Sequence, residues 1–295
     1  MNESEPLMIS KKQKNVKKKF SFRNFLSGIF ALIAIVALFY PIMANYIVSN
    51  QNRTTITQFN KEVSTLSESV IKAQLKEANA YNMYLYKMSQ NLYYGPSKPD
   101  YYKILNINSN GIMGYISIPQ ISLRNVPIYH GDSEETLMLG IGHLPQTSFP
   151  VGGKNTHSVL SAHSGRASNT LFSDIQYLKK GDVFYLNTLN MKLKYRIVEC
   201  KIVLPDDVST LSIHKGKDEV TLVTCYPTGI NSHRLLITGE RVPYSEKTIE
   251  ESLQRNKFGY DFWVFLVSIS LAIIGLVFII LKVIKYNKQR RDNEN

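Results

Sequence analysis

The chain has 295 residues, of which 44% are hydrophobic, and a formal net charge of +12. This length and apolar content allow one sizeable core with attached segments. Eight of the twelve net charges lie in the two terminal tails, before Phe25 and from Lys282 onward. The middle of the chain is therefore only mildly basic. Because a nucleic-acid-binding protein needs a concentrated basic face, we predict no nucleic-acid partner.

Two long stretches, residues 25–48 and 262–281, contain no charged side chain. A bilayer core of about 30 Å requires about 20 apolar residues in a helix, so both stretches are predicted to be transmembrane helices. Lysine and arginine side chains lie outside both stretches. This pattern predicts a two-pass protein of the cell membrane with both termini cytoplasmic and the middle extracellular. The alternative for the first stretch is a cleaved signal peptide, which its length and its poor cleavage site disfavour.

The region after the first apolar stretch is polar and prone to form helices. Phe59, Val63, Leu66, Val70 and Ala73 recur at steps of three and four, which predicts one amphipathic helix continuing to about residue 88. A glycine and two prolines within residues 93–100 predict a loop and the boundary of the main domain.

After residue 111 the pattern changes to short runs rich in β-branched and aromatic residues, separated by Gly, Pro, Asn and Asp. Seven or eight strands at this spacing favour a closed barrel or a sandwich. Two short helical stretches are predicted, near residues 134–140 and 169–178. A hairpin tip is predicted near Asn190.

The chain has two cysteines, Cys200 and Cys225. Cys225 ends an apolar strand-like run and precedes a loop containing Pro227, which would leave its thiol reachable. A thiolate is a nucleophile when a neighbouring cation stabilises it. Two alternatives stay open at this point: burial as a small apolar side chain, and a Cys200–Cys225 disulfide. Cys200 lies in the middle of a strand-like run and is expected to be packed.

Among six histidines, His163 is the strongest candidate for a general base or acid, because it follows a β run and precedes Ser-Gly. His143 and His157 are rivals. Arg234 opens the apolar run that follows the Cys225 loop and is a candidate cation for the same site. No carboxylate or cysteine lies near His157 and His163 in the sequence at ligand spacing, so we predict neither a metal nor a cofactor.

An ordered set of motifs resembles the sortases, the cysteine transpeptidases of Gram-positive cell surfaces. The blocks cover most of residues 111–244: "MGYISIPQISLRNVPIYHG", "GIGHLPQTSFPVGGKNTHSVLSAHSGR", "LFSDIQYLKKGDVFYL" and "TCYPTGINSHRLLITGER". The last block, the two apolar stretches and an upstream helix end with Ala78, Tyr81, Asn82 and Leu85 are similar to class C, the pilin-polymerising sortases.

The resemblance implies a closed, roughly eight-stranded sortase-type β-barrel with short helices, an N-terminal amphipathic helix and two transmembrane helices. It implies that Cys225 attacks the Thr–Gly bond of an LPxTG-like sorting signal and forms a thioacyl intermediate. His163 would transfer the protons, and Arg234 would hold the substrate and stabilise the oxyanion. The implied partners are pilin subunits with such signals and an acceptor lysine, so that the product is an isopeptide bond.

The implied organisation follows the chain from end to end. It comprises a cytoplasmic basic tail (1–24), a transmembrane helix (25–48), an extracellular helical segment with a linker or lid-like loop (49–102), the sortase β-barrel catalytic domain (103–245), a juxtamembrane linker (246–261), a transmembrane helix (262–281) and a cytoplasmic basic tail (282–295).

Two features depart from the class C pattern. The usual lid motif, Asp-Pro-aromatic, is missing; the matching stretch has Pro99-Asp100-Tyr101 instead. "SAHSGR" replaces the more usual Gly-His-Arg-Gly around His163. Three alternatives remain open: a cell-wall-anchoring sortase that uses a peptidoglycan amine, a cysteine hydrolase, and a non-catalytic surface assembly protein with a Cys200–Cys225 disulfide.

Overall fold

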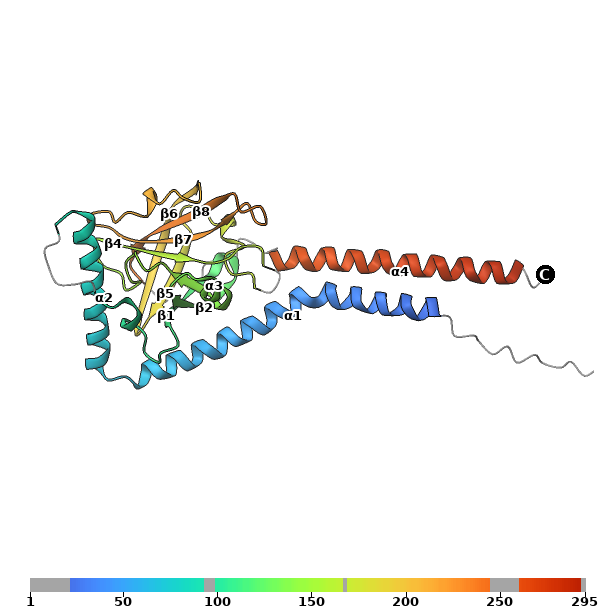
Figure 1. Cartoon of the computed structure of the whole chain (residues 1–295), viewed down its shortest axis with the longest axis horizontal. Coiled ribbons are helices and arrows are strands. Elements are labelled where there is room, and N and C mark those ends of the chain that lie inside the picture. The colour runs from blue at the N-terminus through green and yellow to red at the C-terminus, as the bar shows by residue number, and fades with distance from the viewer. Residues whose placement is uncertain (1–21, 93–98, 167–168, 245–259, 293–295) are drawn as a thin grey trace, which may run out of the picture.

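The computed structural model describes residues 22–92, 99–166, 169–244 and 260–292. Figure 1 shows a barrel flanked by α1 and α2, with the N-terminal part of α1 and all of α4 projecting side by side away from it. The helices and strands are α1 (Phe22–Thr65), α2 (Glu68–Ser89), β1 (Ile112–Ile118), β2 (Leu123–His130), α3 (Glu134–Leu139), β3 (Ile141–His143), β4 (Thr156–Ser161), β5 (Val183–Thr188), β6 (Met191–Val203), β7 (Asp218–Tyr226), β8 (His233–Val242) and α4 (Tyr260–Asp292).

The eight strands close into one barrel in the order β1-β2-β3-β4-β7-β8-β6-β5. The pairs β2/β3 and β4/β7 are parallel, and the other neighbours are antiparallel. The predicted eight-stranded barrel is confirmed, as is the hairpin tip, because β5 ends at Thr188 and β6 begins at Met191. The helix predicted near residues 169–178 is wrong in extent: only the 3₁₀ turn η3 (Ile175–Tyr177) forms there.

The barrel interior is filled by apolar and aromatic side chains from every strand. Phe184 of β5 and Tyr195 of β6 stack with ring centroids 5.5 Å apart, and both are fully buried. Gly239 of β8 lies against this pair: a Cβ atom at Gly239 would come within 2.6 Å of the Phe184 ring. Only glycine leaves room for the two rings, so this position determines how closely β8 approaches the core.

The single amphipathic helix predicted through residue 88 is wrong, because the chain forms two helices there. Ser67 interrupts the run: its side chain accepts a hydrogen bond from the Val70 amide and caps α2. The buried face changes at the break. Phe59 and Val63 of α1 are buried, whereas Val70 is exposed and α2 instead buries Ala78, Tyr81 and Asn82.

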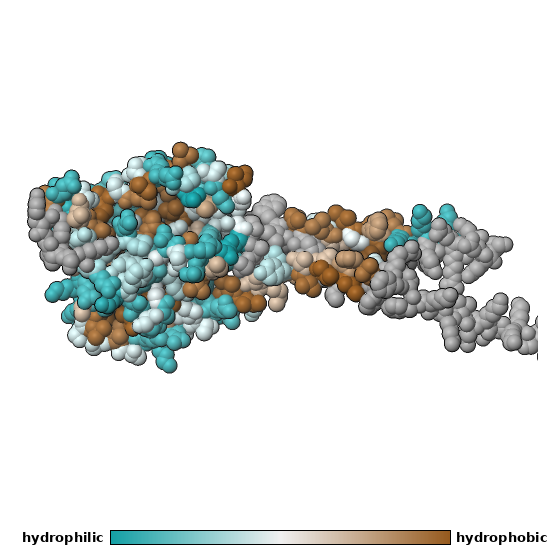
Figure 2. Space-filling model, viewed as in Figure 1, coloured by the Kyte–Doolittle hydropathy of each residue, from teal (hydrophilic) through white to brown (hydrophobic). Residues whose placement is uncertain are grey.

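The two stretches predicted to span a membrane are helical, within α1 and α4. Figure 2 shows hydrophobic side chains over the projecting parts of both helices. In the part of the chain that the structure describes, however, no helix is long and apolar enough to cross a membrane. The transmembrane assignment therefore stays a prediction of the sequence. Most of the N-terminal basic tail, nearly all of the predicted linker 246–261 and residues 293–295 lie outside the described residues.

Candidate active site

Cys225 is the penultimate residue of β7, and its side chain is half-buried. Four of the five residues before it, Val220, Thr221, Leu222 and Thr224, are buried, which holds the end of the strand in place. Loop residues 227–232 follow at once and are more exposed. The thiol thus sits on a rigid strand at a position that an extended substrate can reach.

Arg234 faces Cys225 across the β7/β8 ladder, where the two residues are direct Cα partners. The guanidinium Nη1 donates to the carbonyl oxygens of Asn231, at 3.3 Å, and His233, at 3.1 Å. These contacts turn the side chain toward the β7/β8 loop. The ladder thus places Arg234 on the strand next to Cys225.

His163 reaches the same end of the barrel because β4 and β7 run parallel. Ser161 is paired with Val223, so His163 and Cys225 each follow the last pair by two residues. Hydrogen bonds continue the alignment beyond β4: the Ala162 amide donates to the Val223 carbonyl at 3.1 Å, and the Thr224 hydroxyl donates to the Ala162 carbonyl at 2.7 Å.

Ser164 completes this connection, since its hydroxyl donates to the Cys225 carbonyl at 2.8 Å. The three predicted site residues therefore come from three strand ends, β4, β7 and β8, that lie next to one another in the barrel.

The His163 ring has an acidic neighbour that we did not predict. Its Nε2 lies 3.3 Å from Oε1 of Glu134, the first residue of α3, and Arg166 Nη1 lies 3.7 Å from the same oxygen. The carboxylate is 64% exposed and the His163 side chain 23% exposed. The helix at residues 134–140 was predicted, but nothing local in the sequence indicated that its first turn faces His163.

The rival histidines His143 and His157 are structural. His143 is fully buried, with Nε2 2.8 Å from the Ser148 carbonyl and Nδ1 3.0 Å from the Tyr101 hydroxyl. Burial lowers the pKa of His143 from 6.5 to about 4. His157 is also buried, and burial lowers its pKa as well. Neither ring lies at the Cys225 end of β7, so neither is a candidate base.

One group among the described residues has the spacing of metal ligands: His157, His214 and Glu219, whose ligand atoms lie within 4.8 Å of one another. These atoms already have partners. His214 Nδ1 is 2.6 Å from the Glu219 carboxylate, and His157 Nε2 is 2.7 Å from the Thr221 hydroxyl. The Lys217 ammonium lies 3.5 Å from the Glu219 carboxylate, and its positive charge would repel a metal ion bound there. These hydrogen bonds join the loop before β7 to the first residues of β4 and β7.

Cys200 does not pair with Cys225, since both cysteines are free. Cys225 faces Arg234 and Cys200 faces Ile237, on opposite sides of β8. Two strand spacings and a three-residue offset separate their Cα atoms by roughly 14 Å, and a disulfide requires less than about 7 Å. The disulfide alternative is therefore wrong.

The expectation that Cys200 is packed is also wrong, because its side chain is exposed. β5 pairs with β6 only as far as Arg196, so the following part of β6, residues 199–202, has β8 as its strand neighbour and is exposed.

The lid-like stretch is described only from Pro99 onward; residues 93–98 lie outside the described part of the chain. Asp100 caps the 3₁₀ turn η1 (Tyr101–Lys103) by accepting from the Tyr102 amide. Tyr101 is buried, its ring stacks on Phe149 and His143, and its hydroxyl accepts from the Gly131 amide at 2.9 Å. The aromatic residue of this stretch is therefore anchored beside the end of β2 and β3.

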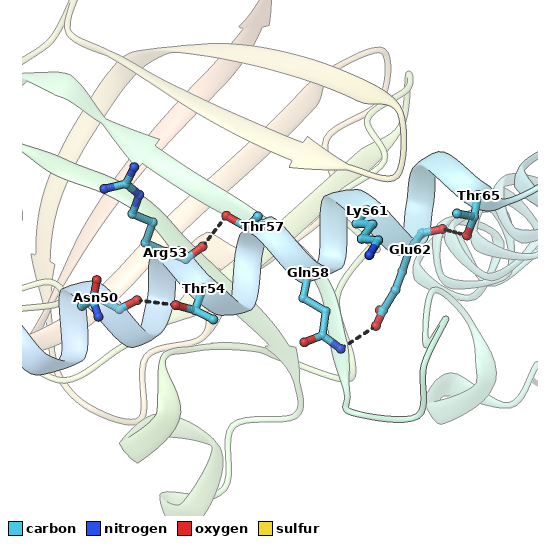
Figure 3. A pocket seen from close by; sticks show the side chains of 8 residues that line it. All are labelled: Asn50, Arg53, Thr54, Thr57, Gln58, Lys61, Glu62 and Thr65. Atoms are coloured by element: carbon cyan, nitrogen blue, oxygen red, sulfur yellow. Dashed lines mark hydrogen bonds between the residues drawn. The ribbon is translucent and has the colours of Figure 1, made fainter.

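An open hollow of about 630 Å³ lies elsewhere, along the polar face of α1 (Figure 3). Arg53, Lys61 and Glu62 are its charged lining residues, and hydroxyl and amide side chains make up the rest. It contains no thiol or imidazole, so it is not a second candidate for acyl transfer.

A thiol, an imidazole and a guanidinium at one rim of a β-barrel can perform acyl transfer through a covalent thioester. A family model described as a sortase domain matches residues 116–242. Sortase A of Bacillus anthracis is 31% identical over 176 residues, which cover 58% of this chain and 81% of that protein.

Two solved structures are similar in fold and sequence. The Clostridium perfringens sortase C structure with the C-terminal cell wall sorting motif has a TM-score of 0.58 and 42% identity, covering 65% of this chain and 99% of that chain. Sortase C1 of GBS pilus island 1 has a TM-score of 0.61 and 36% identity, and the match covers 66% of this chain and 100% of that chain.

The barrel and the composition of its rim thus define a cysteine transpeptidase. The chain belongs to the sortase family, and its structural neighbours are class C sortases.

Proposed function

We propose that the chain cleaves an LPxTG-like sorting signal between Thr and Gly and joins pilin subunits through an isopeptide bond. The observation that carries this proposal is the register of the barrel, which places Cys225 opposite Arg234 and level with His163. The similar structures, one with a cell wall sorting motif and one from a pilus island, support this class of substrate.

In the proposed reaction the Cys225 thiol gives its proton to His163, and the sulfur attacks the threonine carbonyl carbon. The carbon–nitrogen bond to glycine breaks, the leaving amine takes the proton from His163, and a thioester remains on Cys225. A lysine amine of the next pilin then attacks the thioester. His163 removes its proton, the amide forms, and the thiol is restored. Arg234 supplies the fixed cation near the developing oxyanion.

The test uses the full chain in detergent, mixed with a Leu-Pro-x-Thr-Gly peptide and analysed by intact mass spectrometry with digestion. An acyl adduct on Cys225 that lysine discharges is the expected result. Cys225→Ala should form no adduct, and Arg234→Ala should lose turnover by about 100-fold. Discharge by a peptidoglycan amine but not by a pilin lysine would instead favour cell-wall anchoring. An adduct on another residue would refute the role of Cys225.

We also propose that the barrel lies outside the cell membrane, with residues 25–48 and 262–281 as its anchors and both tails cytoplasmic. The apolar runs and their basic flanks support this placement. Protease added to intact cells should remove the barrel and spare an epitope tag at either terminus. Protection of the barrel, or release of the chain into the soluble fraction, would contradict the topology.

A further inference from the structure

Helix α3 places one carboxylate against the ring of His163. The helix begins directly after β2, and Ser133 caps it by accepting from the Thr136 amide at 3.3 Å. Glu134 is its first residue, and the cap orients that first turn. The carboxylate oxygen Oε1 then lies 3.3 Å from Nε2 of His163.

The nitrogen that Glu134 approaches is enclosed. Nε2 of His163 is buried and has no hydrogen-bond partner of good geometry in the described structure. An unpaired polar atom in such a place is unfavourable, whereas an N–H directed at a carboxylate is favourable. At 3.3 Å the two atoms are within hydrogen-bonding distance, and the exposed carboxylate can rotate to accept from an N–H on Nε2.

Hydrogen bonds fix the backbone around His163, but they do not orient its imidazole ring. The Phe172 amide donates to the His163 carbonyl at 3.1 Å, and the flanking residues Ala162 and Ser164 bond to the end of β7. These bonds fix the position of the His163 backbone, but they do not determine which ring nitrogen carries the proton. That choice depends on the groups around the imidazole.

We propose that Glu134 is a positioning residue for His163, acting on the proton of Nε2. The carboxylate keeps that proton on Nε2, which leaves Nδ1 to exchange the other proton with the Cys225 thiol and with the amines. Glu134 itself gains no proton. This inference rests on the proposed acyl transfer by Cys225 and His163.

The charged groups that face this cluster come from several elements. Arg166, after β4, shares the Glu134 carboxylate at 3.7 Å, and Arg234 enters from β8 next to Cys225. Arg166 is a permanent cation, and it competes with His163 for the same Glu134 oxygen. We therefore expect that removing the Glu134 carboxylate lowers the reactivity of Cys225 only moderately.

The experiment measures how fast iodoacetamide alkylates Cys225 at pH 7 in the full chain carrying Cys200→Ala. Alkylation reports the thiolate that His163 supports and needs no sorting signal. Glu134→Ala should slow it by about fivefold, the scale of a partly exposed ion pair. Glu134→Asp should restore most of the rate, and Glu134→Gln should lie between them. Glu135→Ala is the matched control on the same helix and should alkylate at the parent rate.

A double-mutant cycle tests whether the effect passes through His163. In the His163→Ala background, Glu134→Ala should cause no further slowing. An equal slowing in that background, or no slowing in the parent, would overturn the inference. If the parent alkylates but never forms an acyl adduct with the Leu-Pro-x-Thr-Gly peptide, the proposed substrate is wrong, and the cycle still decides the role of Glu134.

Discussion

At the residue scale, the position of Cys225 depends on bonds made by its neighbours. Ser164 donates to the Cys225 carbonyl, and Thr224 donates to the Ala162 carbonyl. Each of the two segments, the one after β4 and the end of β7, thus donates one hydrogen bond to a backbone carbonyl of the other. Ser164 lies in the "SAHSGR" sequence, one of the two departures from the usual class C pattern, so this departure has a structural role in this chain.

We expect Ser164→Ala to lower the free energy of unfolding by about 1 kcal/mol, the typical net value of one hydrogen bond. It should also lower kcat several-fold, because His163 and Cys225 would no longer be held at a common level. The measurement combines urea unfolding with peptide turnover. Ser164→Thr keeps the hydroxyl and should restore kcat; an unchanged kcat in Ser164→Ala would show that the bond does not position the site.

The buried His143 makes a prediction about pH. Its pKa is lowered from 6.5 to about 4 by burial, so the unfolded chain binds a proton in this interval that the folded chain does not. The stability contributed by the neutral side chain is present above pH 6.5 and is lost as the pH falls toward 4. The loss from this group amounts to at most about 3 kcal/mol.

Unfolding free energies measured by urea between pH 7.5 and 4.5 should therefore fall with pH in the parent chain. His143→Gln keeps a hydrogen-bonding side chain but cannot titrate, so its curve should be flatter. Equal slopes in the two proteins would show that His143 binds a proton equally well in the folded and unfolded chains.

At the element scale, two neighbouring residues in the second half of α2 bond this helix to the segment between β3 and β4. Asn82 clamps the backbone of Phe149: its side-chain amide donates to the Phe149 carbonyl at 3.2 Å, and its oxygen accepts from the Phe149 amide at 2.7 Å. Tyr81 donates to the Pro145 carbonyl and packs on the Phe149 ring. These are the Tyr-Asn positions of the helix-end motif in the sequence, so this part of the motif serves docking rather than chemistry.

Asn82→Ala should destabilise the chain by about 2–4 kcal/mol, because it leaves two buried backbone groups of Phe149 without partners. Asn79→Ala is the matched control, since Asn79 is exposed on the same helix. Chemical unfolding measures both variants, and limited proteolysis should cleave within α2 faster in Asn82→Ala. Equal stability of the two variants would mean that the clamp contributes little to docking.

The short strand β3 and the break at Ser67 show where sequence patterns are insufficient at this scale. β3 has three residues, too few for a hydrophobic period, and it exists because β2 and β4 pair with it on either side. The break at Ser67 lies inside a continuous apolar periodicity, and the cap competes with that periodicity. In both cases the deciding interaction is tertiary or depends on a single side chain.

At the scale of the whole molecule, closure of the barrel determines which side chains meet. β8 separates β6 from β7, so Cys200 and Cys225 remain apart although both belong to strands that pair with β8. Desolvation raises the pKa of the Cys200 thiol, which makes it a weaker nucleophile than its exposure alone suggests.

Intact mass of the purified chain should therefore be the same before and after reduction, and two alkyl groups should add under non-reducing conditions. Cys200→Ala should keep full turnover. A gain of about two protons on reduction would mean that the strand order does not hold in solution.

The sequence by itself determined the local and ordered features of this protein. Period-two apolar runs, turn residues and the order of the motif blocks sufficed for the barrel, for its family, and for Cys225, His163 and Arg234 as the candidate site. The physical reason is that each signal lies within a few residues, or in a fixed order of blocks, and needs no knowledge of distant contacts.

Only the tertiary structure decided which distant side chains are neighbours. Glu134 lies beside His163 because α3 packs on β3, the strand next to β4, and no period in the sequence encodes that approach. The burial of His143 and His157 and the separation of the two thiols have the same origin. A closed barrel sets these distances through strand order and register, which follow from the packing of all eight strands together.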